Sequence, residues 1–73
     1  MDESLLIERL LKENPVFRKL HDEHRRRETD LVALKEKPFL SDKERLEEKE
    51  LKKKKLALKD QMYRIMKDFQ KTA

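Results

Sequence analysis

The chain has 73 residues, 49% of them charged, a formal net charge of +4 at pH 7, and no glycine, cysteine or tryptophan. This length allows one small domain, and the lack of cysteine excludes disulfides, thiolate chemistry and cysteine-zinc sites. The lack of glycine disfavours tight strand turns and phosphate-binding loops. No apolar run reaches the roughly 20 residues that span a bilayer, and no signal peptide is recognisable. We therefore expect a cytoplasmic protein with no transmembrane segment.

The first predicted element is a short amphipathic helix over about residues 3–13. Its apolar side chains recur three and four positions apart, as on one face of a helix: Leu6, Ile7, Leu10 and Leu11. About eleven residues are too few for a stable isolated helix, so this segment should dock on another part of the chain. Asn14 and Pro15 then start a new helix, because Asn is a good N-cap and Pro a good first helical residue.

The second predicted helix runs from residue 15 to about 36. Its seam residues alternate at steps of three and four, the spacing of a heptad repeat: Phe17, Leu20, His24, Arg27, Leu31 and Leu34. This seam is apolar at both ends and polar in its middle.

The stretch 37–41 is predicted to be a turn. Pro38 lacks a backbone N–H and disfavours helix in the residue before it, so the second helix should end there. Ser41 and Glu44 have the spacing of a capping box, in which each side chain accepts a hydrogen bond from the backbone N–H of the other. The Phe and Leu that follow the proline are expected to tuck back over the end of the hairpin.

The third predicted helix covers about residues 42–70. Its seam again alternates at steps of four and three: Leu51, Lys55, Leu58, Met62, Ile65 and Phe69. Three further residues widen this stripe enough for more than one neighbour: Leu56, Tyr63 and Met66. The predicted fold is therefore all-α, an antiparallel, coiled-coil-like helical hairpin preceded by a short N-terminal helix, in one domain of residues 1–73.

An antiparallel hairpin also predicts a register. Residues whose numbers sum to about 77–78 should lie level, because both helices rise about 1.5 Å per residue. Leu31 would then face Leu46, and the polar middle of the second helix would face residues 51–55. The first helix would come level with the last turns of the third.

Three runs of the sequence resemble the YdcH-like family of small, mostly bacterial proteins, a domain of unknown function. They are Phe17-x-x-Leu20-x-x-Glu23-His24, then Leu31, then Leu51-Lys52-Lys53-x-Lys55-Leu56-x-Leu58-Lys59-Asp60. The resemblance covers about residues 5–66 and implies a cytoplasmic helical hairpin with coiled-coil character. It brings no activity, cofactor or ligand. Arg27 stands where the family more often has an aliphatic residue, and Gln61 where it tends to have an acid.

Two basic runs should reach similar heights on the hairpin and form a candidate basic belt: Arg25, Arg26, Arg27, Lys52, Lys53, Lys54 and Lys55. Such a belt could hold phosphates without sequence preference. Acidic residues lie among the basic ones, and no aromatic side chain is present there to stack on bases, which favours a solvated, salt-bridged surface. Weak, sequence-independent nucleic-acid binding is therefore the alternative function.

A second candidate is an interaction face near the end of the third helix, formed by Met62, Tyr63, Ile65, Met66 and Phe69. Methionine and aromatic side chains on a basic helix suit a partner groove or a membrane surface. The predicted register favours the simpler interpretation that the first helix covers this face.

His21 and His24 are spaced so that they could share a metal ion, but further ligands of a stable site are missing. A polar seam histidine paired with a carboxylate is favoured for His24. No nucleophile–base pair or cofactor motif is recognisable, so we predict no catalytic residue, metal or cofactor, and no enzyme. The leading hypothesis is a non-catalytic protein-interaction or scaffold module. Its partner would be a second copy, in a dimer or higher assembly, or another helical protein.

Overall fold

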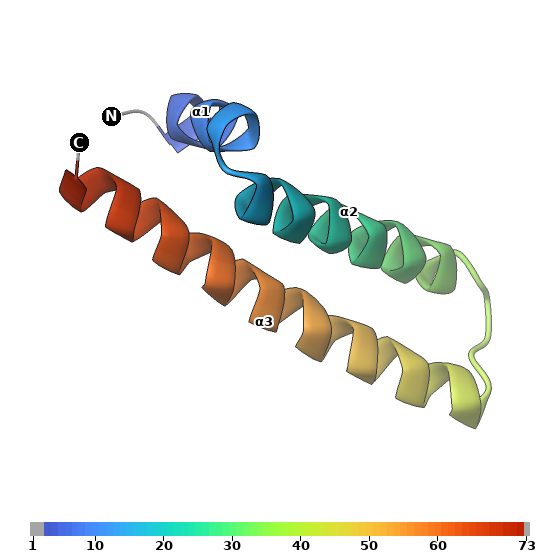
Figure 1. Ribbon diagram of the computed structural model, residues 1–73. Helices are drawn as coiled ribbons and strands as arrows, with labels where there is room; N and C mark the ends of the chain where they lie inside the picture. Colours follow the sequence, from blue (N-terminus) through green and yellow to red (C-terminus); the bar gives the residue numbers. More distant parts are fainter. Residues whose placement is uncertain (1–2, 73) are drawn as a thin grey trace.

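The computed structural model describes residues 3–72. These form three helices: α1 (Glu3–Glu13), α2 (Pro15–Lys35) and α3 (Asp42–Thr72). Helices α2 and α3 run antiparallel, and α1 folds over the open end of the hairpin (Figure 1). The described part of the chain contains no strand and has the shape of a rod, 47 × 19 × 16 Å. The predicted all-α hairpin with a short leading helix is confirmed.

Side-chain hydrogen bonds fix the junction between α1 and α2. The Oδ1 atom of Asn14 accepts a hydrogen bond from the N–H of Phe17 at 3.0 Å, as expected of an N-cap. The guanidinium of Arg18 donates to the carbonyl oxygen of Leu11 at 2.8 Å and to that of Lys12 at 3.3 Å. These carbonyls have no partner within their own helix, so Arg18 closes the end of α1 from the next helix.

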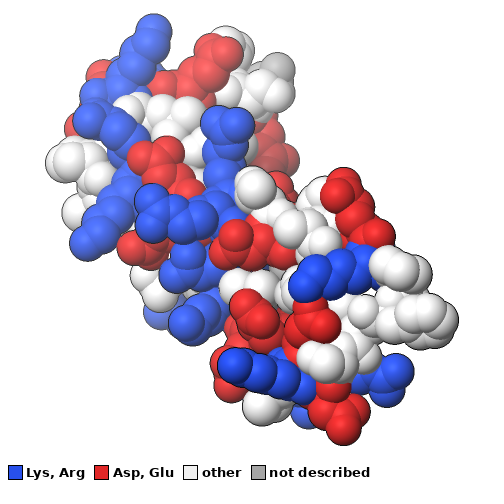
Figure 2. Space-filling view, turned by 90° about the vertical axis from the view of Figure 1, so that its right-hand side faces the viewer, with Lys and Arg blue, Asp and Glu red and all other residues white. Residues whose placement is uncertain are grey.

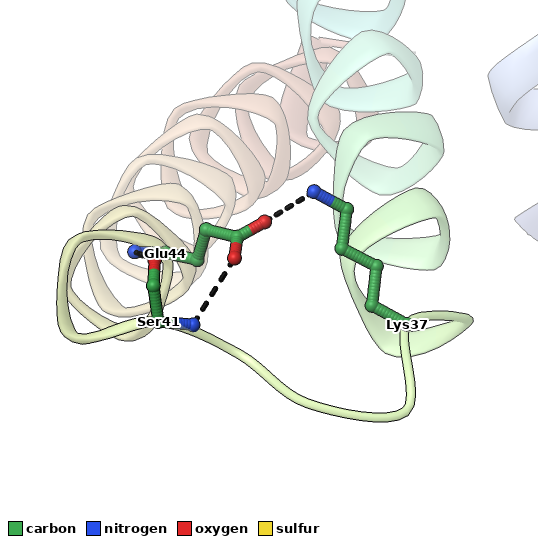
Figure 3. Close-up of polar contacts among 3 residues, drawn as sticks. All are labelled: Lys37, Ser41 and Glu44. Carbon is green, nitrogen blue, oxygen red and sulfur yellow. Dashed lines mark hydrogen bonds and ion pairs between the residues drawn. The ribbon is translucent and has the colours of Figure 1, made fainter.

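The turn between α2 and α3 is closed by the predicted capping box. The N–H of Ser41 donates to one carboxylate oxygen of Glu44 at 3.1 Å, and the N–H of Glu44 donates to the Ser41 hydroxyl at 3.1 Å. The other Glu44 oxygen accepts from the ammonium group of Lys37, which comes from the far side of the turn (Figure 3). One carboxylate thus ties both sides of the turn together.

Phe39 does not tuck back over the hairpin end, so that expectation was wrong. Its side chain is 87% exposed, whereas Leu40 is half-buried. The Lys37–Glu44 ion pair spans the turn at this level. We attribute the outward position of Phe39 to this polar bridge.

The register also differs from the prediction. Two ion pairs of the described residues cross between the two arms of the helical hairpin, Lys37 with Glu44 and Glu28 with Lys55. Their residue numbers sum to 81 and 83, whereas the predicted register requires sums of about 77–78. Helix α3 is therefore displaced by about one helical turn from the predicted alignment. The physical reason is the connection at 36–41, which lets α3 begin beyond the end of α2.

This displacement changes which leucines meet. Leu31 is buried, but Leu46 is 58% exposed because the first turns of α3 extend past the end of α2. Leu51, which is half-buried, comes level with Leu31 instead. The predicted pairing of Leu31 with Leu46 was wrong.

The core lies mostly at the end of the rod where α1 docks. Four buried side chains form its main cluster: Leu6, Leu10, Phe17 and Met66. Leu31, Leu34 and Leu58 are also buried, outside this cluster. Docking of the short helix is thus confirmed. Of the three residues predicted to widen the α3 stripe, Met66 is buried, whereas Leu56 and Tyr63 are 63% and 47% exposed in the single chain.

Among the described residues, none of the helices combines the length and the apolar character that crossing a membrane requires.

Candidate functional site

An open groove lies between α2 and α3, and we call it the histidine groove. Its volume is about 360 Å³. One wall comes from α2 and the other from α3, and α1 closes one end with Glu3 and Ile7. A second hollow of about 400 Å³ continues from it and shares Glu3, Tyr63 and Met66 with it.

Helical spacing builds both walls in the same way. Residues at i, i+3, i+4 and i+7 share one face of a helix. On α2 these are His21, His24, Arg25 and Glu28, and on α3 they are Lys59, Met62, Tyr63 and Met66. The walls therefore combine basic, acidic and imidazole groups with two methionines and one tyrosine ring.

His24 is a groove residue with an unsatisfied hydrogen-bonding atom. Its Nε2 atom is buried and has no hydrogen-bond partner. Its pKa lies below the usual 6.5, first because burial desolvates the charged form, and further because Lys55, Lys59 and His21 repel a proton. Glu28 acts in the opposite direction. The neutral imidazole is therefore favoured.

The expected pairing of His24 with a carboxylate was wrong, because no such hydrogen bond is present in the described chain. The nearby carboxylate is that of Glu28, which instead forms an ion pair with the ammonium of Lys55 at 3.4 Å. Glu28 thus influences His24 only through its field.

His21 lies on the same wall and is held by its own neighbours. Its ring stacks on Phe17 with 6.5 Å between centroids and 26° between planes. Its Nδ1 atom lies 4.0 Å from a carboxylate oxygen of Asp22. Within residues 3–72 no three His, Cys, Asp or Glu side chains are grouped so that they could hold a metal ion.

The Lys55–Glu28 ion pair shows that the two runs of the basic belt lie near one another, with Lys52 to Lys54 closer to the turn than Arg25 to Arg27. Lys52 has a second acidic partner, Glu48, at 3.8 Å. The remaining five belt residues form no ion pair with the described acids: Arg25, Arg26, Arg27, Lys53 and Lys54. Figure 2 shows Lys and Arg side chains gathered over the middle of one face of the rod, with Asp and Glu among them.

The candidate interaction face near the end of α3 is mostly in contact with α1. Met66 belongs to the main cluster, and three more of its residues pack against that cluster: Met62, Ile65 and Phe69. The guanidinium of Arg9 also lies 5.3 Å from the centre of the Phe69 ring. Only Tyr63 remains largely open, with the ammonium of Lys59 at 5.8 Å from its ring centre.

Two features of the surface were missed from the sequence alone. The histidine groove was one, although the matching spacing of His21 to Glu28 and of Lys59 to Met66 was a readable signal for it. The exposed Phe39 was the other, and no local pattern separates an apolar turn residue that packs from one that points outward.

A family model described as "Protein of unknown function (DUF465)" matches residues 17–66. This span runs from Phe17 through α2, the turn and most of α3 to Met66. It is consistent with the resemblance to the YdcH-like family. Neither the curated proteins nor the solved structures include a significant match to the chain.

Proposed function

The chain belongs to the DUF465 family of proteins of unknown function, and we propose that it is a small, non-catalytic protein-interaction module of the cytoplasm. The cytoplasmic location rests on the resemblance to the YdcH-like family. The interaction role rests on the turn of the hairpin, where one large apolar side chain is held out into solvent.

Phe39 is the observation that supports this proposal most directly. Full burial of a Phe side chain is worth roughly 1.5–3 kcal/mol, and at 87% exposure this chain gains little of that. Aromatic side chains are enriched among the residues that anchor protein interfaces. A partner with an apolar pocket would bury the ring.

The setting of Phe39 suits an anchor. The capping box and the Lys37–Glu44 ion pair hold the turn from both sides, so little backbone freedom would be lost on binding. Two more exposed apolar residues, Val32 at 54% and Leu46 at 58%, lie in the helix ends that flank the turn. The turn end therefore offers apolar contact area beside its central aromatic ring.

Photo-crosslinking in cells tests this role. A photoreactive phenylalanine analogue at position 39 should give a discrete crosslinked product, whereas the same analogue at Lys49, an exposed position of α3, should not. A product of twice the chain mass would identify a second copy as the partner, and any other mass a different protein. Equal product patterns at the two positions would refute the proposal.

A stability control completes the experiment. Phe39→Ser should leave the free energy of unfolding within about 0.5 kcal/mol of the original, since the ring packs on little. In affinity capture without crosslinking, the same substitution should abolish recovery of the partner that the crosslink at position 39 identifies. Unchanged capture by this variant would also contradict the proposal.

Weak, sequence-independent nucleic-acid binding through the basic belt is a second candidate. It is supported by the closeness of the two runs on the folded hairpin and by the five belt residues without an acidic partner. A mobility-shift assay at near-physiological salt should show binding that is lost when Lys52, Lys53 and Lys54 become Glu. The charge-matched control replaces three exposed lysines outside the belt: Lys43, Lys49 and Lys71. Equal loss in both triple variants would exclude a specific role of the belt.

A further inference from the structure

The histidine groove contains a buried polar atom for which the protein provides no partner, Nε2 of His24. Buried side-chain nitrogens are bonded in the large majority of cases, to protein, water or ligand. The open space next to this residue is the groove itself. His24 lines this groove, so a ligand in the groove would lie beside its imidazole ring.

The charges around His24 favour an anion. Arg25 lines the groove from α2, and Lys59 lines it from α3. Lys55 and Lys59 both disfavour a proton on His24, whereas Glu28 favours one. The nearest acid, Glu28, is already engaged with Lys55 at 3.4 Å. Cations on both walls leave an anionic group between them as the complementary ligand.

The number and kind of these donors fit a phosphate group. Arg presents a planar fork of N–H donors, Lys a compact charge, and the imidazole a third donor from a different direction. A phosphate monoester offers three strong acceptor oxygens, more than a carboxylate can.

Part of the remaining groove lining is apolar, and the groove is larger than one phosphate needs. The apolar part is formed by Ile7, Met62 and Met66, and the aromatic ring of Tyr63 also lines the groove. Its volume of about 360 Å³ lies in the range of pockets for small organic ligands, about 300–1,000 Å³. Inorganic phosphate would leave this apolar part uncovered, whereas a ligand with an apolar body would cover it.

We propose that the histidine groove binds a small organic phosphate. The phosphate group lies among Arg25, Lys59 and His24, and the apolar or aromatic body lies over Met62 and Met66 against Tyr63. The site is independent of the proposed partner at the turn, which lies at the other end of the hairpin (Figure 1).

Binding of such a ligand takes up a proton. A phosphate beside His24 favours the imidazolium, which the free groove disfavours, so affinity increases as pH falls through the neutral region. The charged and titratable groups that surround this equilibrium come from all three helices: Glu3, His21, Arg25, Glu28, Lys55, Lys59 and Tyr63.

The test is an NMR titration of the full chain with phenyl phosphate, following the imidazole protons of His21 and His24. We expect saturable shifts and a rise in the pKa of His24. Inorganic phosphate, which lacks the ring, and benzoate, which lacks the phosphate, should each bind more weakly. Absence of saturation below about 10 mM phenyl phosphate would overturn the proposal, and benzoate binding as tightly as phenyl phosphate would overturn the assignment of phosphate.

Two matched substitutions place the ligand in the groove. Lys59→Ala removes a charge-assisted hydrogen bond and should weaken binding about tenfold. Lys53→Ala removes the same charge from an exposed position of α3 outside the groove and should change affinity less than about twofold. Both positions are exposed, so both variants keep the fold. Equal effects of the two substitutions would show only general attraction to a basic chain and would refute the site.

Discussion

Substitution of Leu10 by Ala tests whether α1 is an integral part of the fold. Leu10 is 1% exposed and belongs to the main cluster with Leu6, Phe17 and Met66. Leu5 stands on the same helix but is 58% exposed. The two positions thus offer the same chemical change in a buried and an exposed setting, with the same effect on helix propensity.

The size of the effect follows from burial. Leu→Ala at a buried site costs about 2–5 kcal/mol, from lost transfer free energy and from the cavity that remains. A domain of this length has a total stability of roughly 4–11 kcal/mol, so the loss is a large fraction of the whole. Because 1 kcal/mol shifts Tm by about 4–8 °C in a domain of this size, Leu10→Ala should lower Tm by at least about 8 °C. Leu5→Ala should change stability by less than about 0.5 kcal/mol.

Thermal unfolding followed by circular dichroism at 222 nm, with urea titrations for the free energies, measures both variants. Hydrogen exchange of the α1 amides adds local information, since a helix that merely rests on the hairpin would exchange rapidly in both variants. If Leu10→Ala and Leu5→Ala have the same stability within error, α1 does not pack as described, and the main cluster is wrong.

The remaining predictions concern the turn and the groove. Ser41→Ala should lower the free energy of unfolding by about 1 kcal/mol in urea titrations, whereas Ser41→Asp, which keeps a capping oxygen, should lose little. The ammonium of Lys37 and then the N–H of Ser41 lower the pKa of Glu44 to about 2 from its usual 4.5. The stabilisation from Glu44 is therefore complete above pH 4.5 and is lost as pH falls toward 2, so Tm of Glu44→Gln should fall less over this range. Burial lowers the pKa of His24 below 6.5, so its neutral form supports the fold at higher pH and stability decreases as pH falls through 6.5. An NMR titration that gives His24 a pKa at or above 6.5 would contradict this account.

The three helices, and the first residues of α2 and α3, could be predicted from the sequence because each depends on local interactions. Asn14 and Ser41 cap the helices that follow them. Pro38 lies in the connection between α2 and α3, where it interrupts the helical hydrogen-bond pattern along the chain. Periodic apolar residues then show which face of each helix turns inward. Such signals act over a few residues and are not changed by the arrangement of distant parts.

The register and the exposure of Phe39 do not follow in the same way. The alignment of α2 with α3 depends on the path of residues 36–41, and several paths of this length suit the same flanking helices. A displacement of one turn keeps the inward faces in contact, so the apolar pattern alone does not distinguish the two alignments. The ion pairs Lys37–Glu44 and Glu28–Lys55 belong to the observed alignment, and long side chains of this kind offer many alternative pairings.

Of the candidate sites, the basic belt could be predicted from the sequence, whereas the histidine groove could not. The two basic runs could be placed near each other because any hairpin with this turn brings them together, although the observed register offsets them along the rod. The histidine groove needed the observed alignment, since His24 meets Lys59 only when α3 is displaced toward the turn. The residues of each wall are regularly spaced in the sequence. Which residues of α2 lie opposite which residues of α3, however, depends on the alignment of the two helices in the folded chain.

The charged level around Arg27 and Lys55 separates two apolar regions along the rod. The cluster built on Phe17 lies on one side, and Leu31 with Leu34 lies on the other. Thermal motion can therefore open one end of the hairpin while the other end stays closed, because no continuous apolar seam transmits the opening. In native-state hydrogen exchange the amides should then fall into two groups with different protection, one for each end. Such a molecule could release its turn to a binding protein without loosening the end that carries α1.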